Sequence, residues 1–284
     1  MVAGPAVDVA AAAKPRPRSE ILLRALRPLT DALVGVLGRA GVDPQAIVLT
    51  HASLGVLAAL LVALGPPAWP WAALLLLLKT LLDNLDGGVA RATGRVTRLG
   101  RYLDSVLDTL VNLLLFAALA LHGPGAWAWP LAALAALVLM LVLSLDFILE
   151  QRYKSLRGSD AGPGVEGPIG GPLPLYRLVR GLYEVLLAPQ DRWLARADAT
   201  LFRRLAGMGE ARAPLDVRLA WSDLFSTATL VNLGLSTQLL IFALCLLLGV
   251  PFAYVWFILG AGGYVLAVQG LRAWRLRRYL GTRP

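Results

Sequence analysis

Long apolar runs alternate with short polar or glycine- and proline-containing connections along most of the chain. A run of about twenty apolar residues is long enough to cross the roughly 30 Å hydrocarbon layer of a membrane as a helix. Six runs reach that length, at residues 45–65, 71–92, 99–121, 130–149, 225–249 and 252–272. We therefore expect an all-α integral membrane protein with six transmembrane helices. The first four lie within residues 42–150 and the last two within residues 223–284.

A different pattern precedes the first run. Between residues 20 and 41, leucines recur at helical spacing while arginines occupy other faces, which is typical of a helix that lies on a membrane surface. The apolar stripe consists of Leu22, Leu26, Leu29, Leu33 and Leu37. We predict an N-terminal interfacial amphipathic helix at 20–41 on the inner leaflet, after a disordered cytosolic tail at 1–19.

A long polar insert, residues 151–222, separates the fourth run from the fifth. It begins with a glycine- and proline-rich stretch at 158–174, and it becomes amphipathic again between Tyr176 and Leu205. Glycine and proline clusters interrupt regular structure, whereas the later spacing favours a helix or a helix pair on the membrane surface. A lid, or an element that selects the acceptor, is the alternative.

The basic residues show which ends of the runs share a side of the membrane. All 27 Lys and Arg except Lys79 lie in the N-terminal segment, in the turn at 91–101, in the insert at 152–218, or from Arg272 onward. The connections at 65–70, 122–130 and 249–253 hold none, and Trp69, Trp71, Trp127 and Trp129 lie within or directly beside them. Cytoplasmic loops are enriched in Lys and Arg, and tryptophans gather at membrane interfaces. We therefore expect both termini and the basic turn to be cytoplasmic.

The composition agrees with a membrane protein. Hydrophobic residues make up 57% of the 284 residues, and the formal net charge is +9. Because the positive charge follows the membrane-edge loops, anionic lipid headgroups are the expected partners and nucleic acid is not. The one cysteine, Cys245, excludes an intrachain disulfide and is interpreted as core packing. The glycines at 260–263 are interpreted as close helix packing.

Four aspartates interrupt the apolar pattern inside the second and third runs. Asp83 and Asp86 are three residues apart, so they share a helix face. Asp104 and Asp108 are four apart and also share a face, and a short turn brings the two helices back together. An unpaired acid in a membrane interior costs roughly 2.5–3.5 kcal/mol. All-oxygen ligands favour Mg²⁺ or Mn²⁺, and two such ions would neutralise four acids in a site suited to phosphoryl chemistry.

Small residues adjoin these acids. Gly87, Ala90 and Gly100 remove bulk from the helix faces and leave room for a phosphorylated ligand to approach the backbone. Arg91 adds a fixed charge that suits a diphosphate. Lys79, one turn before Asp83, is interpreted as its ion-pair partner on the same helix. His51 is interpreted as a histidine satisfied within the core.

The full pattern reads Asp83-x-x-Asp86-Gly87-x-x-Ala90-Arg91, eight residues, then Gly100-x-x-x-Asp104-x-x-x-Asp108. It resembles the signature of the CDP-alcohol phosphotransferase (CDP-alcohol phosphatidyltransferase) family at every fixed position. The chain departs from that family at Gln45, where members often have asparagine.

The resemblance implies a transferase that moves a phosphatidyl-type or phosphoalcohol group from a CDP-linked donor to an alcohol hydroxyl and releases CMP. It implies metal binding by Asp83, Asp86 and Asp104, with Asp108 contributing and acting as the base. Gly87, Ala90, Gly100 and Arg91 would form the nucleotide pocket. Family members are usually homodimeric.

The sequence does not identify the acceptor alcohol. CDP-diacylglycerol as donor with a small polar, phosphorylated acceptor is favoured because arginines crowd the cytosolic mouth. Transfer of a CDP-linked headgroup to diacylglycerol is the alternative within the family, and Asn112 and Asp146 are candidates for the acceptor site. Outside the family, the alternatives are a membrane prenyltransferase, a cation transporter with an acidic site, or a catalytically silent scaffold.

Overall fold

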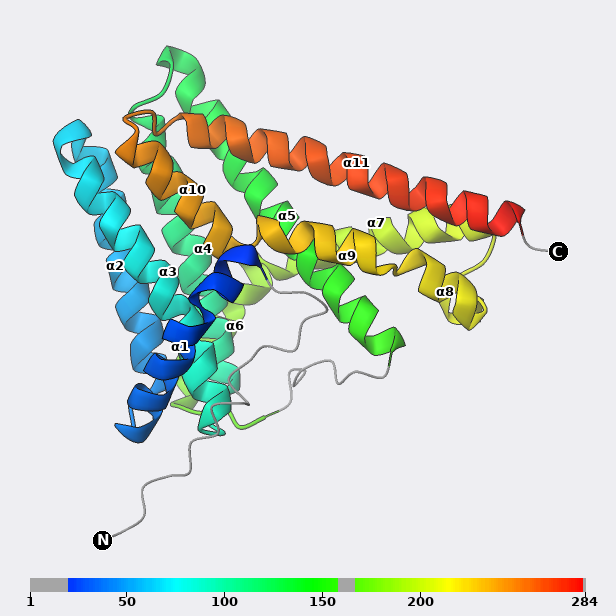
Figure 1. Ribbon diagram of the computed structural model, residues 1–284, viewed down its shortest axis with the longest axis horizontal. Coiled ribbons are helices and arrows are strands. Elements are labelled where there is room, and N and C mark those ends of the chain that lie inside the picture. The colour runs from blue at the N-terminus through cyan, green and yellow to red at the C-terminus, as the bar shows by residue number, and fades with distance from the viewer. Residues whose placement is uncertain (1–19, 158–166, 283–284) are drawn as a thin grey trace, which may run out of the picture.

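The computed structural model describes residues 20–157 and 167–282, and all regular elements within these ranges are helices (Figure 1). The all-α prediction is confirmed. The predicted tail at 1–19, residues 158–166 of the glycine- and proline-rich stretch, and the side chain of Leu22 lie outside the described part. The α-helices are α1 (Ile21–Arg39), α2 (Pro44–Leu64), α3 (Trp69–Ala92), α4 (Arg98–Ala120), α5 (Ala128–Leu156), α6 (Leu173–Leu186), α7 (Ala188–Ala206), α8 (Leu215–Trp221), α9 (Leu224–Leu230), α10 (Leu235–Leu247) and α11 (Ala253–Gly281).

Capping residues set the start of α2, the end of α2 and the start of α4. Asp43 caps α2 by accepting the backbone N–H of Gln45 at 3.1 Å, and Pro44 fills the first position of the helix. Gly65 ends α2 with φ of +98°, a value that glycine adopts without steric cost. Thr97 caps α4 by accepting the N–H of Gly100 at 3.1 Å. The short turn at 93–97 therefore reverses the chain and places α4 antiparallel to α3.

The main core lies between α2, α3, α4, α5, α10 and the start of α11. Many of its residues are alanines, and Ala58, Ala72 and Ala135 are fully buried. Small residues let helix backbones approach closely, which is how helices associate in membranes. The connections between α2 and α3, α4 and α5, and α10 and α11 gather at the upper left of Figure 1. The predicted acidic region lies toward the opposite end of the α2–α4 bundle.

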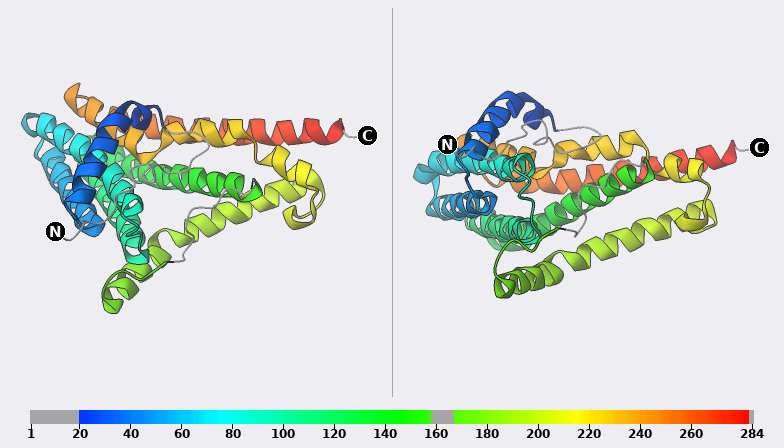
Figure 2. Two further views of the ribbon diagram at one scale, coloured as in Figure 1. Left: turned by 60° about the horizontal axis from the view of Figure 1, so that its bottom comes forward. Right: turned by 90° about the horizontal axis from the view of Figure 1, so that it is seen from below.

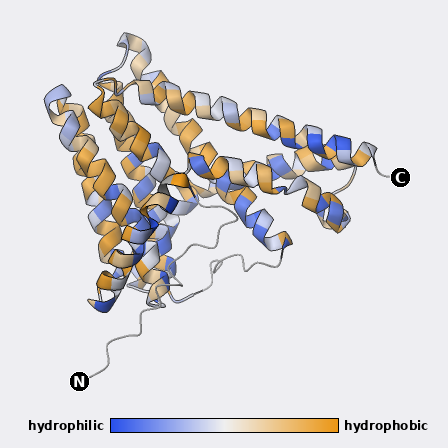
Figure 3. Ribbon diagram, in the orientation of Figure 1, coloured by the Kyte–Doolittle hydropathy of each residue, from blue (hydrophilic) through white to orange (hydrophobic). Residues whose placement is uncertain are grey.

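Five helical stretches within the described residues are long and apolar enough to cross a membrane. They are 44–64, 98–120, 125–156, 215–247 and 253–281. The predicted second span forms α3, but α3 carries Lys79, Asp83, Asp86 and Arg91 and is not among them. Figure 3 shows the apolar residues concentrated on α2 and α10, and hydrophilic residues toward the far ends of α5 and α11.

The predicted fifth span is not one continuous helix. The chain forms α9, a 3₁₀ turn at 231–233, and then α10, which begins after an extended Gly234. The start of α1 uses this break, since the N–H of Ile21 donates to Asn232 Oδ1 at 3.1 Å and Thr237 donates to Glu20 at 3.1 Å. The sequence did not reveal this break in the helix, because the residues at the break are nearly as apolar as those of a spanning helix.

Helix α1 packs against α3. Val34 is buried among Ile47, Leu85 and Val89, and Gly88 lets it approach the α3 backbone. Leu29, a member of the predicted apolar stripe, is 49% exposed. The predicted helix is therefore present, and one of its faces packs on protein rather than on a membrane surface.

The insert forms α6, α7 and α8, of which α7 and α8 extend beside α5 and α11 (Figures 1 and 2). Tyr176 and Val179 of α6 pack on the first turns of α4, and Tyr102 lies 5.0 Å from the ring of Tyr183. Burial and the neighbouring Asp191, which accepts its hydroxyl hydrogen bond at 3.2 Å, raise the pKa of Tyr183 to about 12.

A buried ionic cluster fixes the far end of this region. Asp198 of α7 pairs with Arg152 of α5 and Arg272 of α11, and it also accepts the indole N–H of Trp221 at 3.2 Å. The Arg272 guanidinium stacks 3.6 Å from the Trp221 ring. Three helices that are distant in the sequence therefore meet at one carboxylate.

Candidate metal centre

The four predicted aspartates lie at matching depths on α3 and α4. Asp86 is six residues before the end of α3 at Ala92, and Asp104 is six residues after the start of α4 at Arg98. At a rise of 1.5 Å per residue, each lies about 9 Å from its helix end. Because α3 and α4 are antiparallel and joined at those ends, the acidic faces meet.

A histidine occupies the point where they meet. His51 Nε2 lies 3.5 Å from Asp86 Oδ2, 3.6 Å from Asp104 Oδ1 and 3.9 Å from Asp83 Oδ1. Its other ring nitrogen, Nδ1, lies 3.9 Å from Asp108 Oδ1. The His51 side chain is completely buried. One residue of α2 therefore contacts all four acids of α3 and α4.

Four of these side chains form a group of metal-ligand type. One ligand atom from each of His51, Asp83, Asp104 and Asp108 lies within 4.8 Å of the others. Asp86 is outside this group, and its carboxylate accepts the backbone N–H of Gly87. The structure thus brings the predicted acids together, with a histidine added to the set.

The donors suit a divalent cation. Both ring nitrogens of His51 and Oδ1 of Asp104 are buried without a hydrogen-bond partner among the described residues. Buried polar atoms are normally satisfied, and neighbouring carboxylates repel one another. A divalent ion removes both problems, and carboxylate oxygens are the ligands that Mg²⁺ and Mn²⁺ prefer. The residues present therefore fit the metal that the sequence led us to expect.

Lys79 supplies one positive charge to the cluster. Its buried ammonium lies 2.7 Å from Asp108 Oδ1 and 3.8 Å from Asp83 Oδ1. The predicted pair with Asp83 along α3 is present, but the shorter contact is the hydrogen bond to Asp108 on α4. Sequence spacing predicts neighbours within one helix and does not reveal the closer partner on the next.

The interpretation of His51 as a satisfied core histidine was wrong. A signal for its true position was present in the sequence, because His51 lies seven residues after the start of α2 at Pro44. That spacing places it about 10 Å from the helix end, the same depth as Asp86 and Asp104. Comparing depths across the three helices would have brought these side chains together.

The predicted small residues adjoin the cluster on both helices. A side chain at Gly87 would meet the Arg91 guanidinium, which lies 3.0 Å from the position a Cβ would take. At Gly100 a Cβ would lie 3.0 Å from Thr97 Oγ1 and 3.7 Å from Gln45. Ala90 is half-buried on α3. Gly87 and Gly100 thus leave room for the Arg91 and Thr97 side chains near the acids.

The two candidate acceptor residues lie on different elements. Asn112 is half-buried on α4, one turn beyond Asp108. Asp146 is buried on α5, at 6% exposure. Neither belongs to the group of metal-ligand type.

Residues 168–170 of the insert accept hydrogen bonds from the N-terminal ends of α2 and α4. Backbone N–H groups of Arg98 and Leu99 donate to the carbonyls of Pro168 and Ile169, each at 3.0 Å. The Gln45 side chain donates to the Gly170 carbonyl at 2.7 Å. The residue at which the chain departs from the resemblance thus attaches the insert beside the centre.

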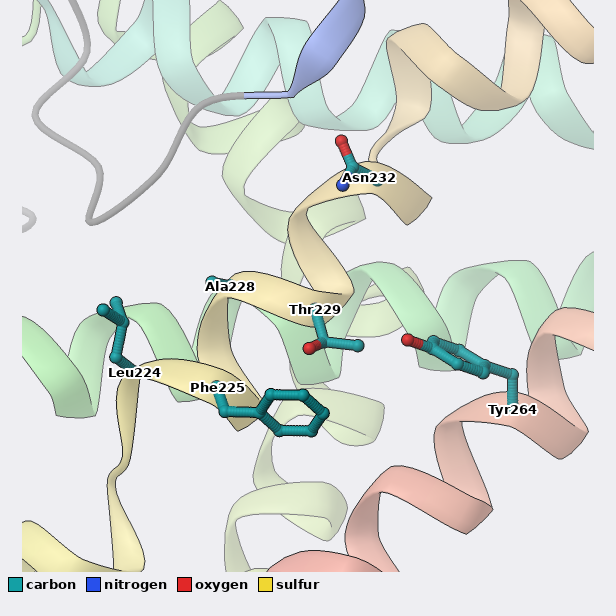
Figure 4. Close-up of a pocket in the computed structure, with 6 residues that line it drawn as sticks. All are labelled: Leu224, Phe225, Ala228, Thr229, Asn232 and Tyr264. Carbon is teal, nitrogen blue, oxygen red and sulfur yellow. The ribbon is translucent and has the colours of Figure 1, made fainter.

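Two hollows lie on the surface. One, of about 350 Å³, runs along α2 next to Leu107 and is lined by Leu49, Ala52, Ser53, Val56, Leu57 and Leu60. The other, of about 460 Å³, lies between α9 and α11, where Thr229 faces Tyr264 (Figure 4). The described residues that line the second hollow include none of the four acids. The described residues that line the first hollow likewise include none of the four acids.

Comparisons with known proteins agree with the geometry. A family model described as CDP-alcohol phosphatidyltransferase matches residues 44–197, which include all four acids. A phosphatidylinositol phosphate synthase of Cutibacterium acnes is 36% identical over 121 residues, covering 40% of this chain and 55% of that protein.

Two further relatives match over shorter stretches. A bifunctional IPC transferase and DIPP synthase of Aquifex aeolicus is 38% identical over 108 residues, 38% of this chain and 24% of that protein. An archaetidylinositol phosphate synthase of Aeropyrum pernix is 52% identical over 62 residues, 20% of this chain and 32% of that protein. The chain spans at most 55% of the length of these three curated relatives.

Proposed function

The chain belongs to the CDP-alcohol phosphatidyltransferase family, and from this premise we propose that it transfers a phosphatidyl group from CDP-diacylglycerol to the hydroxyl of a small polar alcohol, releasing CMP. The observation that carries the proposal is the convergence of four acids from α3 and α4 on one buried point. Such a cluster suits a diphosphate held by divalent cations.

The chain's own residues have distinct tasks in this reaction. Asp83, Asp86 and Asp104 would hold the cations, and Asp108 would also contact them and accept the proton of the acceptor hydroxyl. An alcohol is a poor nucleophile, so a carboxylate within hydrogen-bond reach assists its attack. Bound Mg²⁺ or Mn²⁺, two ions in all, would offset the charge on the diphosphate and on the departing CMP.

The donor would bind with its nucleotide in the aqueous phase and its acyl chains in the membrane. Its cytidine nucleotide would occupy the space beside Gly87, Ala90 and Gly100, with Arg91 near the diphosphate. Its acyl chains would remain in the bilayer, and the apolar hollow along α2 is proposed to receive part of them. This arrangement accounts for a polar centre placed near the end of apolar helices.

The acceptor is proposed to be a phosphorylated polyol such as inositol phosphate. Several relatives are named phosphatidylinositol phosphate synthases, and the segment at 91–101 between the two pairs of acids carries four arginines that suit a phosphorylated acceptor. Asn112 and Asp146 are proposed to line the acceptor space. Transfer of a CDP-linked headgroup to diacylglycerol is the alternative within the family.

The proposed topology has six membrane spans. Helix α3 would be one of them, with its charged residues shielded from lipid by the neighbouring helices. Both termini and the candidate metal centre would be cytoplasmic. Helices α1 and α6 would lie on the inner leaflet. The outer face of α6 supports this, because Leu175, Leu178, Leu182 and Val185 are exposed at helical spacing, and Val185 is 74% exposed. We also propose that the protein acts as a homodimer.

The test is to incubate the purified protein with CDP-diacylglycerol and a panel of alcohols, and to follow CMP. The panel contains inositol phosphate, glycerol 3-phosphate, serine and inositol. We expect CMP release that needs Mg²⁺ or Mn²⁺ and is fastest with a phosphorylated acceptor. Release only from a CDP-linked headgroup with diacylglycerol would favour the alternative. Ion flux through reconstituted vesicles without nucleotide turnover would instead indicate a transporter.

A further inference from the structure

We propose that a ring nitrogen of His51 is a metal ligand, so that the centre is a mixed nitrogen and oxygen site that binds Mn²⁺ in preference to Mg²⁺. This inference rests on the proposed function, because it assigns a further ligand to the cation site of that reaction. It differs from the set of acids that the motif supplies, since His51 belongs to α2 and lies outside the motif.

The distances suit a shared ion. Two ligands bound at about 2.1 Å lie about 3.0 Å apart at a right angle and about 4.2 Å apart on opposite sides of the ion. The three separations between His51 Nε2 and the nearest oxygens of Asp86, Asp104 and Asp83 range from 3.5 to 3.9 Å and fall inside these limits. They are too long for hydrogen bonds, which are normally shorter than about 3.2 Å.

Hydrogen bonds do not account for the position of His51. The side chain is fully buried, and neither ring nitrogen has a hydrogen-bond partner among the described residues. A buried imidazole of this kind forfeits its hydrogen bonds with water, and the four carboxylates at 3.5–3.9 Å replace them only with longer contacts. A bound cation supplies the missing partner for one nitrogen and neutralises the acids that surround it.

The second ring nitrogen is also suitably placed. A histidine that binds a metal almost always donates its other ring N–H to a carboxylate, a carbonyl or water, and this partner fixes the ring orientation. Asp108 Oδ1 lies 3.9 Å from Nδ1, the ring nitrogen that is not the nearest one to the other three acids. A small movement brings Asp108 within hydrogen-bond reach while Nε2 faces the ion.

The ligand set predicts the preferred metal. Imidazole nitrogen suits transition ions, whereas Mg²⁺ keeps oxygen ligands and several waters. Mn²⁺ accepts both carboxylate oxygen and imidazole nitrogen. One nitrogen ligand among the acids therefore shifts preference toward Mn²⁺ without excluding Mg²⁺ from the oxygen ligands.

The first experiment detects the proposed nitrogen ligand of the metal directly. Electron spin-echo envelope modulation of Mn²⁺ bound to the purified full-length protein detects a coordinated nitrogen nucleus. The variants are His51→Gln and, as a matched control, His122→Gln, which alters the other histidine. His122 bonds to the Val62 carbonyl at the opposite end of α2. We expect nitrogen modulation in the wild type and in His122→Gln, and its loss in His51→Gln.

A competition titration supplies a second readout. We expect His51→Gln to weaken Mn²⁺ binding by at least the roughly tenfold that loss of even an outer-shell partner costs, and to change Mg²⁺ binding by less. Bound Mn²⁺ without nitrogen modulation in the wild type would overturn the inference, even if His51→Gln failed to fold. Modulation that persisted in a folded His51→Gln would overturn it as well. CMP release measured on the same samples in Mg²⁺ tests the proposed function separately.

Discussion

The ammonium of Lys79 lies 2.7 Å from the Asp108 carboxylate, across the contact between α3 and α4. Lys79 is 1% exposed, so water does not screen this charge. In the proposed reaction the Asp108 carboxylate must be correctly oriented before it accepts a proton. The hydrogen bond from Lys79 fixes that orientation, and it links the two helices that carry the acids.

Replacing Lys79 by methionine should destabilise the protein and slow turnover. Removing one partner of a buried ion pair costs roughly 3–5 kcal/mol, because the other charge stays buried. Lys79→Arg, which keeps the charge, should retain most of the stability. Thermal unfolding in detergent measures both effects, and added Mn²⁺ should restore more stability to Lys79→Met than to the wild type. An unchanged melting temperature in Lys79→Met would show that the pair does not matter.

Asp108→Asn should abolish turnover while sparing donor binding. General-base catalysis contributes about 10²- to 10⁴-fold, and asparagine cannot accept the proton. The measurements are the rate of CMP release and the affinity for a CDP-linked donor. Asp31→Asn changes an exposed acid on α1, paired with Arg27 at 3.5 Å, and serves as the control. Substantial activity in Asp108→Asn would remove Asp108 from the role of base.

Two adjacent glycines of α11 provide a matched test of its packing on α5. A Cβ at Gly262 would lie 2.7 Å from Val138 Cγ1, whereas a Cβ at Gly263 would have nothing within 4 Å. Overpacking costs about 1–3 kcal/mol, so Gly262→Ala should lower the unfolding free energy by that amount. Gly263→Ala should be neutral or slightly stabilising. Equal effects at the two positions would contradict the observed contact between α5 and α11.

The cluster around Asp198 should hold the insert against α5 and α11. Asp198→Asn leaves the buried Arg272 without its charged partner, for which a loss of roughly 3–5 kcal/mol is expected. Arg192 and Glu184 form an exposed pair in the same insert, and Glu184→Gln should cost at most about 1 kcal/mol. Limited proteolysis of the insert compares the two variants. Similar cleavage of both would mean that the cluster does not secure the insert.

The sequence predicted the helices and the meeting of the acids because both follow from local spacing. Apolar runs define helix length, and residues three or four apart share a face. Antiparallel helices joined by a short turn must then bring Asp86 and Asp104 to similar depths. These arguments need no knowledge of how more distant segments pack.

Features that depend on packing between distant segments were not predictable in the same way. The contact of Lys79 with Asp108 depends on how α3 and α4 rotate about their axes, and spacing does not set that rotation. The break before Gly234 depends on polar groups at the start of α1. His51 is a partial exception, since its depth on α2 matched the acids, although its orientation toward them could not be deduced.

The central claim is that acids from α3 and α4 together hold divalent cations against a CDP-linked substrate. The most direct measurement is an anomalous difference map from crystals grown with Mn²⁺ and cytidine diphosphate. The account predicts Mn²⁺ peaks bounded by Asp83, Asp86, Asp104 and Asp108, with the diphosphate against them. Acids that point apart, or ordered Mn²⁺ and nucleotide at some other place, would contradict it.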